Sequence, residues 1–127
     1  MGLIQIYRAP LEIIGWEIPG GGIENKETIV QAAIRELFEE TGCQAEKVEK
    51  IGLFYEAPGR TYHPHHVLIA SNPSSSMKHE RLAEEEGIQD FRFFKINEID
   101  EMIIKNKIIS GPTISALKLL SVWLKTV

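Results

Sequence analysis

Short runs of β-branched and aromatic residues alternate with polar stretches over most of the chain. These runs predict strands at residues 3–7, 13–18, 48–56, 66–70 and 91–96. The sequence Pro19-Gly20-Gly21-Gly22 ends the second strand abruptly, and a polar loop is expected at residues 72–76.

Apolar positions three or four residues apart predict helices in the remaining segments. A helix is expected over residues 28–41, closed by Gly42, because glycine readily adopts the left-handed conformation that ends helices. A short helix over residues 97–105 would use Asn97 as its N-cap. Ser110-Gly111-Pro112 opens a last helix, in which Leu117, Leu120 and Leu124 fall near one face. Strands around two substantial helices predict an α+β fold, an α/β/α sandwich with a mixed β-sheet.

Composition excludes several function classes. The 127 residues are the size of one domain, and a hydrophobic share of 43% is enough for a core. The net charge of −4 gives no reason to expect nucleic acid or an anionic membrane as a partner. No apolar run approaches the ~20 residues that span a bilayer. A single cysteine excludes an internal disulfide, and we expect a reducing, cytoplasmic location.

Acidic residues crowd the end of the helix predicted at 28–41. At ~100° per residue, Glu36 and Glu40 lie one turn apart and ~40° from each other, with Glu39 between them and the solvent side. The positions expected to face the core beside them are Val30, Ala33, Ile34, Leu37 and Phe38.

Carboxylates packed this closely repel one another unless a cation lies between them. Their hard oxygen atoms favour Mg²⁺ or Mn²⁺. The glycines before the helix would allow the backbone to approach a pyrophosphate closely. The alternative is an amphipathic helix with a solvated acidic end, which a lone Glu-x-x-Glu-Glu would favour.

The whole pattern from Gly21 to Cys43 favours the metal site over the solvated helix end. Gly21 is followed after five residues by Glu27 and, after seven more, by Arg35-Glu36-Leu37-Phe38-Glu39-Glu40-Thr41-Gly42-Cys43. This stretch resembles the Nudix box, the signature of hydrolases that cleave nucleoside diphosphates linked to another group. Cys43 is the one mild departure from the pattern, because the family usually has an aliphatic residue at that position. The resemblance implies a single Nudix hydrolase domain over residues 1–127.

The resemblance also implies roles for residues of the box. Glu36 and Glu40 would be the principal metal ligands, Glu39 would be a ligand or hold a water, and the carbonyl of Gly20 would be a backbone ligand. Arg35 would orient a neighbouring carboxylate through a charge-assisted hydrogen bond. For Glu27, support of the loop and a purely structural role are both kept open.

The flanks of the box are similar to those of ADP-ribose pyrophosphatases. The similar segments are residues 5–8, 16–24, 54–59 and 108–117. This similarity implies hydrolysis of ADP-ribose to AMP and ribose 5-phosphate. The residues implied to bind substrate are Arg8, Glu17, Gly21 and Pro58.

The chain departs from that subgroup in two places. It begins almost at the strand bearing Arg8, so we expect the N-terminal strands, which supply a swapped dimer and part of the adenine site, to be short or missing. The subgroup commonly has an acidic residue after the Pro-Gly turn, whereas residues 60–66 read Arg-Thr-Tyr-His-Pro-His-His. A homodimer is left open.

Three histidines in that loop, His63, His65 and His66, form a second cluster. They could bind a transition metal or contact phosphate. A surface loop with neighbouring imidazoles is the favoured interpretation, because strand alternation sends His65 and His66 to opposite faces. Arg60 and Tyr62 could touch substrate from the same loop.

Pyrophosphate hydrolysis also needs a general base. In the resembling subgroup it comes from a mobile loop between later strands, and here residues 84–87 offer Glu-Glu-Glu-Gly. Glu86 is the first candidate for this base and Glu85 the second. Glu39, on the helix predicted at residues 28–41, is the alternative outside this loop. A solvated acidic turn is the structural alternative for each.

Other functions fit parts of the pattern. Another nucleotide sugar or a nucleoside triphosphate could be the substrate. A module that binds a nucleotide without cleaving it is the alternative from another class, although such proteins usually lose one of the acids of the box.

Overall fold

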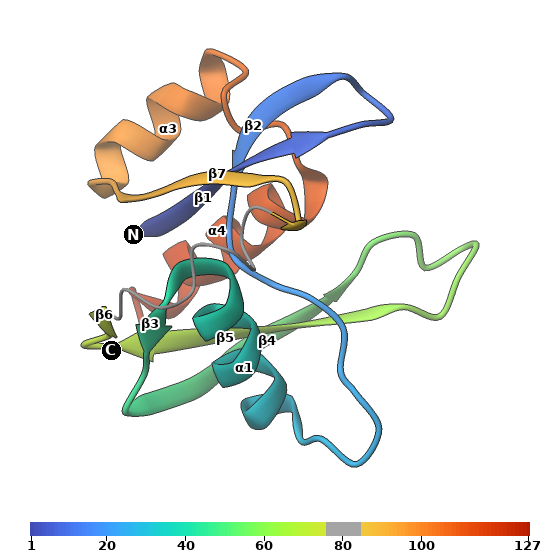
Figure 1. Cartoon of the computed structure of the whole chain (residues 1–127), viewed down its shortest axis with the longest axis vertical. Coiled ribbons are helices and arrows are strands. Elements are labelled where there is room, and N and C mark those ends of the chain that lie inside the picture. The colour runs from blue at the N-terminus through green and yellow to red at the C-terminus, as the bar shows by residue number, and fades with distance from the viewer. Residues whose placement is uncertain (76–84) are drawn as a thin grey trace.

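The computed structural model describes residues 1–75 and 85–127, and its strands form three antiparallel groups (Figure 1). The first is the sheet β2-β1-β7, made of β1 (Gly2–Arg8), β2 (Ile13–Glu17) and β7 (Ile88–Phe93). The second is the long hairpin of β4 (Lys47–Tyr55) and β5 (Pro64–Ser71). The third pairs the two-residue strands β3 (Cys43–Gln44) and β6 (Ser74–Ser75).

Three helices pack on these strands within the described residues. They are α1 (Ile29–Thr41), α3 (Ile96–Ile104) and α4 (Gly111–Trp123). Helix α3 lies along the β2-β1-β7 sheet, α1 lies against the β4–β5 hairpin, and α4 contacts β4 and β5 (Figure 1). The expected α+β sandwich is confirmed. The described strand pairs are all antiparallel, although a mixed sheet was expected.

Both faces of the β2-β1-β7 sheet are apolar. On one face Leu3 of β1 packs with Ile99, Met102 and Ile108, and Leu117 of α4 joins this cluster. On the other face Ile4 and Ile6 pack with Ile88 and Phe91. Successive residues of β1 therefore serve opposite faces, as strand alternation requires. This burial holds β1 and β7 rigidly side by side.

Helix α1 begins and ends at the predicted signals. Thr28 is the N-cap and accepts a hydrogen bond from the Gln31 N–H (3.1 Å), while the Thr28 N–H donates to Gln31 Oε1 (2.9 Å). At the other end Gly42 has φ 71°, in the left-handed region.

The buried side of α1 differs from the prediction. Val30 and Ile34 were expected in the core but are 41% and 38% exposed, whereas Ala32, Glu40 and Thr41 are buried. Apolar periodicity gives the direction of a helix face, but burial requires neighbouring elements to cover it. In the part of the chain that is described, the cover is concentrated at the C-terminal end of α1, where the acids lie.

Four other local predictions differ from the structure. Helix α3 begins after Lys95 instead of Asn97, because the Lys95 N–H donates to Glu98 Oε2 (2.6 Å). The last strand is β7 at Ile88–Phe93 instead of residues 91–96. The predicted loop 72–76 contains β6, and its residue 76 lies outside the described residues. In α4, Leu124 is the C-cap and is exposed, so it does not join the buried face.

None of the described helices combines the length and apolar character needed to cross a bilayer.

Candidate functional site

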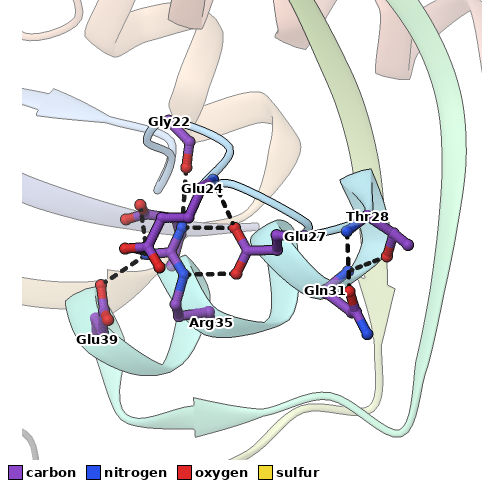
Figure 2. Close-up of polar contacts among 8 residues, drawn as sticks. Gly22, Glu24, Glu27, Thr28, Gln31, Arg35 and Glu39 are labelled. Atoms are coloured by element: carbon purple, nitrogen blue, oxygen red, sulfur yellow. Dashed lines mark hydrogen bonds and ion pairs between the residues drawn. The ribbon is translucent and has the colours of Figure 1, made fainter.

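Arg35 joins the helix α1 to the loop that precedes it (Figure 2). Its guanidinium donates to both carboxylate oxygens of Glu27, at 2.8 and 2.9 Å. It also donates to Glu36 Oε1 (2.9 Å), to Glu39 Oε2 (3.1 Å) and to the carbonyl oxygen of Gly22 (2.9 Å). One arginine therefore orients three carboxylates and fixes the glycine-rich loop against α1. The orienting contact predicted for Arg35 is present.

Glu27 is held by this arginine and by the loop backbone. The Glu24 N–H donates to Glu27 Oε1 (3.0 Å). The hydrogen bonds from Arg35 and then from this N–H lower the pKa of Glu27 to about 2. Glu27 therefore supports the loop, an arrangement that fits both interpretations kept open for it.

A group of three glutamates lies next to this network. Glu36, Glu39 and Glu86 each offer a carboxylate oxygen, and these oxygens lie within 4.8 Å of one another. Glu36 and Glu39 come from the last turns of α1, and Glu86 comes from the residues just before β7. Elements far apart in the chain thus converge on one acidic site. The oxygen donors fit a hard divalent cation such as Mg²⁺ or Mn²⁺.

The backbone after Glu86 fixes its position. Gly87 has φ 82°, and its carbonyl oxygen accepts a hydrogen bond from the Tyr7 N–H of β1 (3.1 Å). Burial raises the pKa of Glu86, and the charges of Glu36 and Glu39 add to the effect. Glu85 and Glu86 are both exposed, but Glu85, the second candidate, does not belong to the three-carboxylate group. Residue 84 lies outside the described residues.

Glu40 lies deeper than the other acids and is only 5% exposed. Its Oε2 accepts a hydrogen bond from the Gly20 N–H (3.2 Å). Burial is the main cause that raises its pKa to about 8, and the charges of Glu36 and Glu86 raise it further. Glu40 therefore borders the acidic group, although its oxygens are not among the three that converge. Gly20 contacts it through its N–H, whereas the prediction concerned the Gly20 carbonyl.

Gly21 leaves room for the Glu36 carboxylate. A Cβ atom at position 21 would overlap Oε1, Cδ and Oε2 of Glu36, whereas a Cβ at Gly20 or Gly22 would meet nothing within 4 Å. Sequence reasoning assigned these glycines to close approach of substrate and missed this contact. A glycine at a fixed spacing before an acidic helix was the only available signal.

Two residues predicted to bind substrate are paired with each other. Arg8 donates to both oxygens of Glu17, with Nε–Oε2 2.9 Å and Nη2–Oε1 2.8 Å. The hydrogen bond to Glu17 is the main cause that raises the pKa of Arg8, and the charge of Glu40 contributes. The pair joins β1 to β2 on an exposed surface.

The fourth, Pro58, lies apart from the acids. It follows β4 and lines a hollow of about 430 Å³ in the β4–β5 loop together with Tyr55, Gly59, Arg60, Thr61 and Tyr62. This loop projects away from α1 (Figure 1). The loop that carries Pro58 and the helix that carries Glu36 and Glu39 therefore lie apart in this view.

Comparison with known proteins matches the chain to the NUDIX domain over residues 8–117. An ADP-ribose pyrophosphatase of Bacillus subtilis (strain 168) is 38% identical over 87 residues, which cover 68% of this chain and 47% of that protein. A methanol dehydrogenase activator of Bacillus methanolicus is 31% identical over 118 residues, covering 93% of this chain and 63% of that protein. The chain thus spans about half to two thirds of the length of these curated relatives.

The fold is shared with a crystal structure described as an ADP compounds hydrolase. The TM-score is 0.84 at 23% sequence identity, and the match covers 98% of this chain and 66% of the other. At that identity the likeness concerns the fold.

The raised pKa of Glu40 predicts a pH-dependent stability of the metal-free protein. Glu40 is protonated up to about pH 8 when folded but titrates near its ordinary 4.5 when unfolded. The folded state binds more protons between these values, so the free energy of unfolding falls as pH rises. Glu40→Gln should lessen this fall by up to about 1.4 kcal/mol per pH unit. The measurement is urea unfolding with a chelator across this range. Glu49→Gln, at an exposed position on β4, is the control, and equal slopes for wild type and Glu40→Gln would contradict the assignment.

The contact of Gly21 with Glu36 predicts an effect on cation binding. Gly21→Ala should displace the Glu36 carboxylate and weaken Mn²⁺ binding about 10-fold or more, as loss of a supporting contact commonly does. Gly22→Ala is the matched control, because its new methyl group meets open space. Calorimetric Mn²⁺ titration measures both. Equal affinities for the two variants would show that Glu36 is not positioned by Gly21.

Proposed function

The chain belongs to the NUDIX family, and on that premise we propose that it hydrolyses the pyrophosphate bond of a nucleoside diphosphate linked to another moiety. The observation that carries the proposal is the convergence of carboxylate oxygens from Glu36, Glu39 and Glu86 within 4.8 Å. We propose ADP-ribose as the substrate, with AMP and ribose 5-phosphate as products. Support comes from the relative named ADP-ribose pyrophosphatase.

The family depends on a divalent metal, and the donor set described above fits one. We propose that Glu36 and Glu39 hold Mg²⁺ or Mn²⁺, with Glu40 and the carbonyl of Gly20 as further ligands. When bound, the ion supplies positive charge to phosphoryl oxygens and lowers the pKa of a bound water. Phosphoryl transfer depends mainly on this kind of positioning and charge neutralisation.

Arg35 prepares the acids for this task. Its hydrogen bonds to Glu36 and Glu39 fix the orientation of their carboxylates before any ligand arrives. Its bonds to Glu27 and to the carbonyl of Gly22 hold the loop that carries Gly21 beside Glu36. Arg35 is in this proposal a positioning residue.

Glu86 is the proposed general base. A base of raised pKa accepts a proton more readily, and burial and neighbouring charges raise the pKa of Glu86. The Glu39 Oε2 atom already accepts a hydrogen bond from Arg35, and Glu85 lies outside the acidic group. Glu86 would take the proton of the attacking water while the carboxylates of α1 hold the cation.

Arg8, Glu17, Gly21 and Pro58 remain the proposed substrate contacts. A guanidinium matches phosphate with two parallel hydrogen bonds, and Arg8 currently gives two to Glu17. Phosphate binding would therefore exchange one oxyanion for another, with Glu17 holding the Arg8 guanidinium until then. Pro58 would contact the substrate from the hollow in the β4–β5 loop.

A nucleotide-sensing module is the second candidate. One relative is named for activation of a dehydrogenase and not for hydrolysis: the methanol dehydrogenase activator, which matches 93% of this chain. Against it, Glu36, Glu39 and Glu86 are all present and positioned. We further propose a cytoplasmic protein of one domain, acting on a small nucleotide, with a homodimer left open.

Product analysis over a substrate panel tests the reaction. With Mg²⁺, the protein should convert ADP-ribose to AMP and ribose 5-phosphate faster than it converts other nucleotide sugars or nucleoside triphosphates. A Glu36→Gln/Glu39→Gln double variant, which lacks two of the converging carboxylates, should be inactive. Release of pyrophosphate from triphosphates alone would replace the proposed substrate. Tight nucleotide binding without turnover would support the sensing module instead.

Substitution of the loop glutamates tests the base. Glu86→Gln should lower kcat about 100-fold or more, because it removes the group that accepts the proton. Glu85→Gln, the neighbouring change outside the acidic group, should keep a kcat close to that of the wild type. Steady-state kinetics at saturating Mg²⁺ measures both. A larger loss in Glu85→Gln than in Glu86→Gln would move the base to position 85.

A further inference from the structure

A glutamate and two histidines lie where the β4–β5 hairpin meets its loop, which projects away from α1 (Figure 1). The antiparallel register pairs Phe54 with His65 and Tyr55 with Pro64. One step further, the same register sets Glu56 opposite His63. Because side chains alternate along a strand, Glu56, His63 and His65 share one face of the hairpin. His66 pairs with Leu53 and belongs to the opposite face, as the alternation predicted.

The side-chain contacts bring these three residues together. His65 Nε2 is 3.5 Å from Glu56 Oε2, and the rings of His63 and His65 meet edge to face with their centroids 4.8 Å apart. The His65 ring is stacked on Phe54, at 4.7 Å and an interplanar angle of 3°. His65 Nε2 is buried without a hydrogen-bond partner among the described residues. His65 Nε2 therefore lies beside the Glu56 carboxylate without a hydrogen bond to it, and the His63 ring packs against the same imidazole.

We propose that Glu56, His63 and His65 bind Zn²⁺. Two imidazoles and one carboxylate are a donor set typical of zinc, whereas the all-oxygen group on α1 favours harder cations. The stack on Phe54 fixes the His65 ring, and Pro64 restricts the backbone between the two histidines. The three ligand atoms are not as close as those of the acidic group, so binding would draw the exposed His63 toward the other two.

A metal at this place would close a loop. Glu56 and His63 flank residues 57–62, which include Pro58, Arg60 and Tyr62 of the hollow. Zn²⁺ would bridge the two ends of this segment and restrict its motion, as a cross-link restricts a loop. The proposal does not depend on the hydrolase activity.

Zn²⁺ titration of the full chain tests the site. With Mg²⁺ in excess to occupy the carboxylates of α1, the wild type should bind one Zn²⁺. His63→Ala and His65→Ala should each weaken that binding about 10-fold or more. His66→Ala is the matched control, since His66 belongs to the other face. Glu36→Gln should also keep the site, which separates it from the acidic group.

Two outcomes of the titration would overturn the proposal. One is unchanged Zn²⁺ affinity in both His63→Ala and His65→Ala. The other is loss of Zn²⁺ binding in Glu36→Gln or His66→Ala to the same extent. Thermal unfolding checks that each variant is folded. If His65→Ala does not fold, His63→Ala, at an exposed position, still decides the test.

Amide hydrogen exchange tests the closing of the loop. Zn²⁺ should slow exchange of the backbone N–H groups in residues 57–62 of the wild type and of His66→Ala, and leave His63→Ala unchanged. Equal protection in His63→Ala would show that the ion acts elsewhere. This measurement needs no substrate and no turnover.

Discussion

The carboxylates of the site repel one another, and the hydrogen bonds from the single guanidinium of Arg35 oppose this repulsion. Glu27, Glu36 and Glu39 all accept hydrogen bonds from it. Without a positive charge among them, acids this close would move apart or take up protons. Arg35 prevents the first, and the raised pKa of Glu40 shows where the second remains favourable. The arginine keeps the acidic group assembled and leaves its remaining oxygens free for a divalent ion.

The fold serves this balance through contacts between distant parts of the chain. The loop after β2 places Gly20 against Glu40 and Gly21 against Glu36. The buried β1 strand, through the Tyr7 N–H, holds Gly87 and so the neighbouring Glu86. Shifts of the β2-β1-β7 sheet relative to α1 would therefore separate the acids. The apolar packing of that sheet therefore helps to hold the acidic residues in place.

Most features with local causes were predictable from the sequence. Thr28 and Gly42 bound α1 because capping depends on a few neighbouring residues. The Asn97 cap failed for a local reason too, since the Lys95–Glu98 bond starts α3 earlier. Strand β6 was missed because two serines form a strand only when Cys43 and Gln44 lie beside them.

Features that depend on tertiary cover were not predictable. The exposure of Val30 and Ile34 and the burial of Glu40 follow from which elements reach α1, and periodicity does not contain that information. The assembly of Glu86 with the acids of α1 was expected only through resemblance to a known family. The pairing of Arg8 with Glu17 and the close fit of Gly21 against Glu36 needed coordinates.

The Arg8–Glu17 pair bears on which anions the surface attracts. A guanidinium already matched by a carboxylate presents almost no net charge to solvent, so orthophosphate or sulfate gains little by approaching it. An anion held by additional contacts at a neighbouring place would displace Glu17 more readily. Any anion that binds Arg8 thus competes with a carboxylate that already accepts two hydrogen bonds, which favours ligands with further contacts over small inorganic ions.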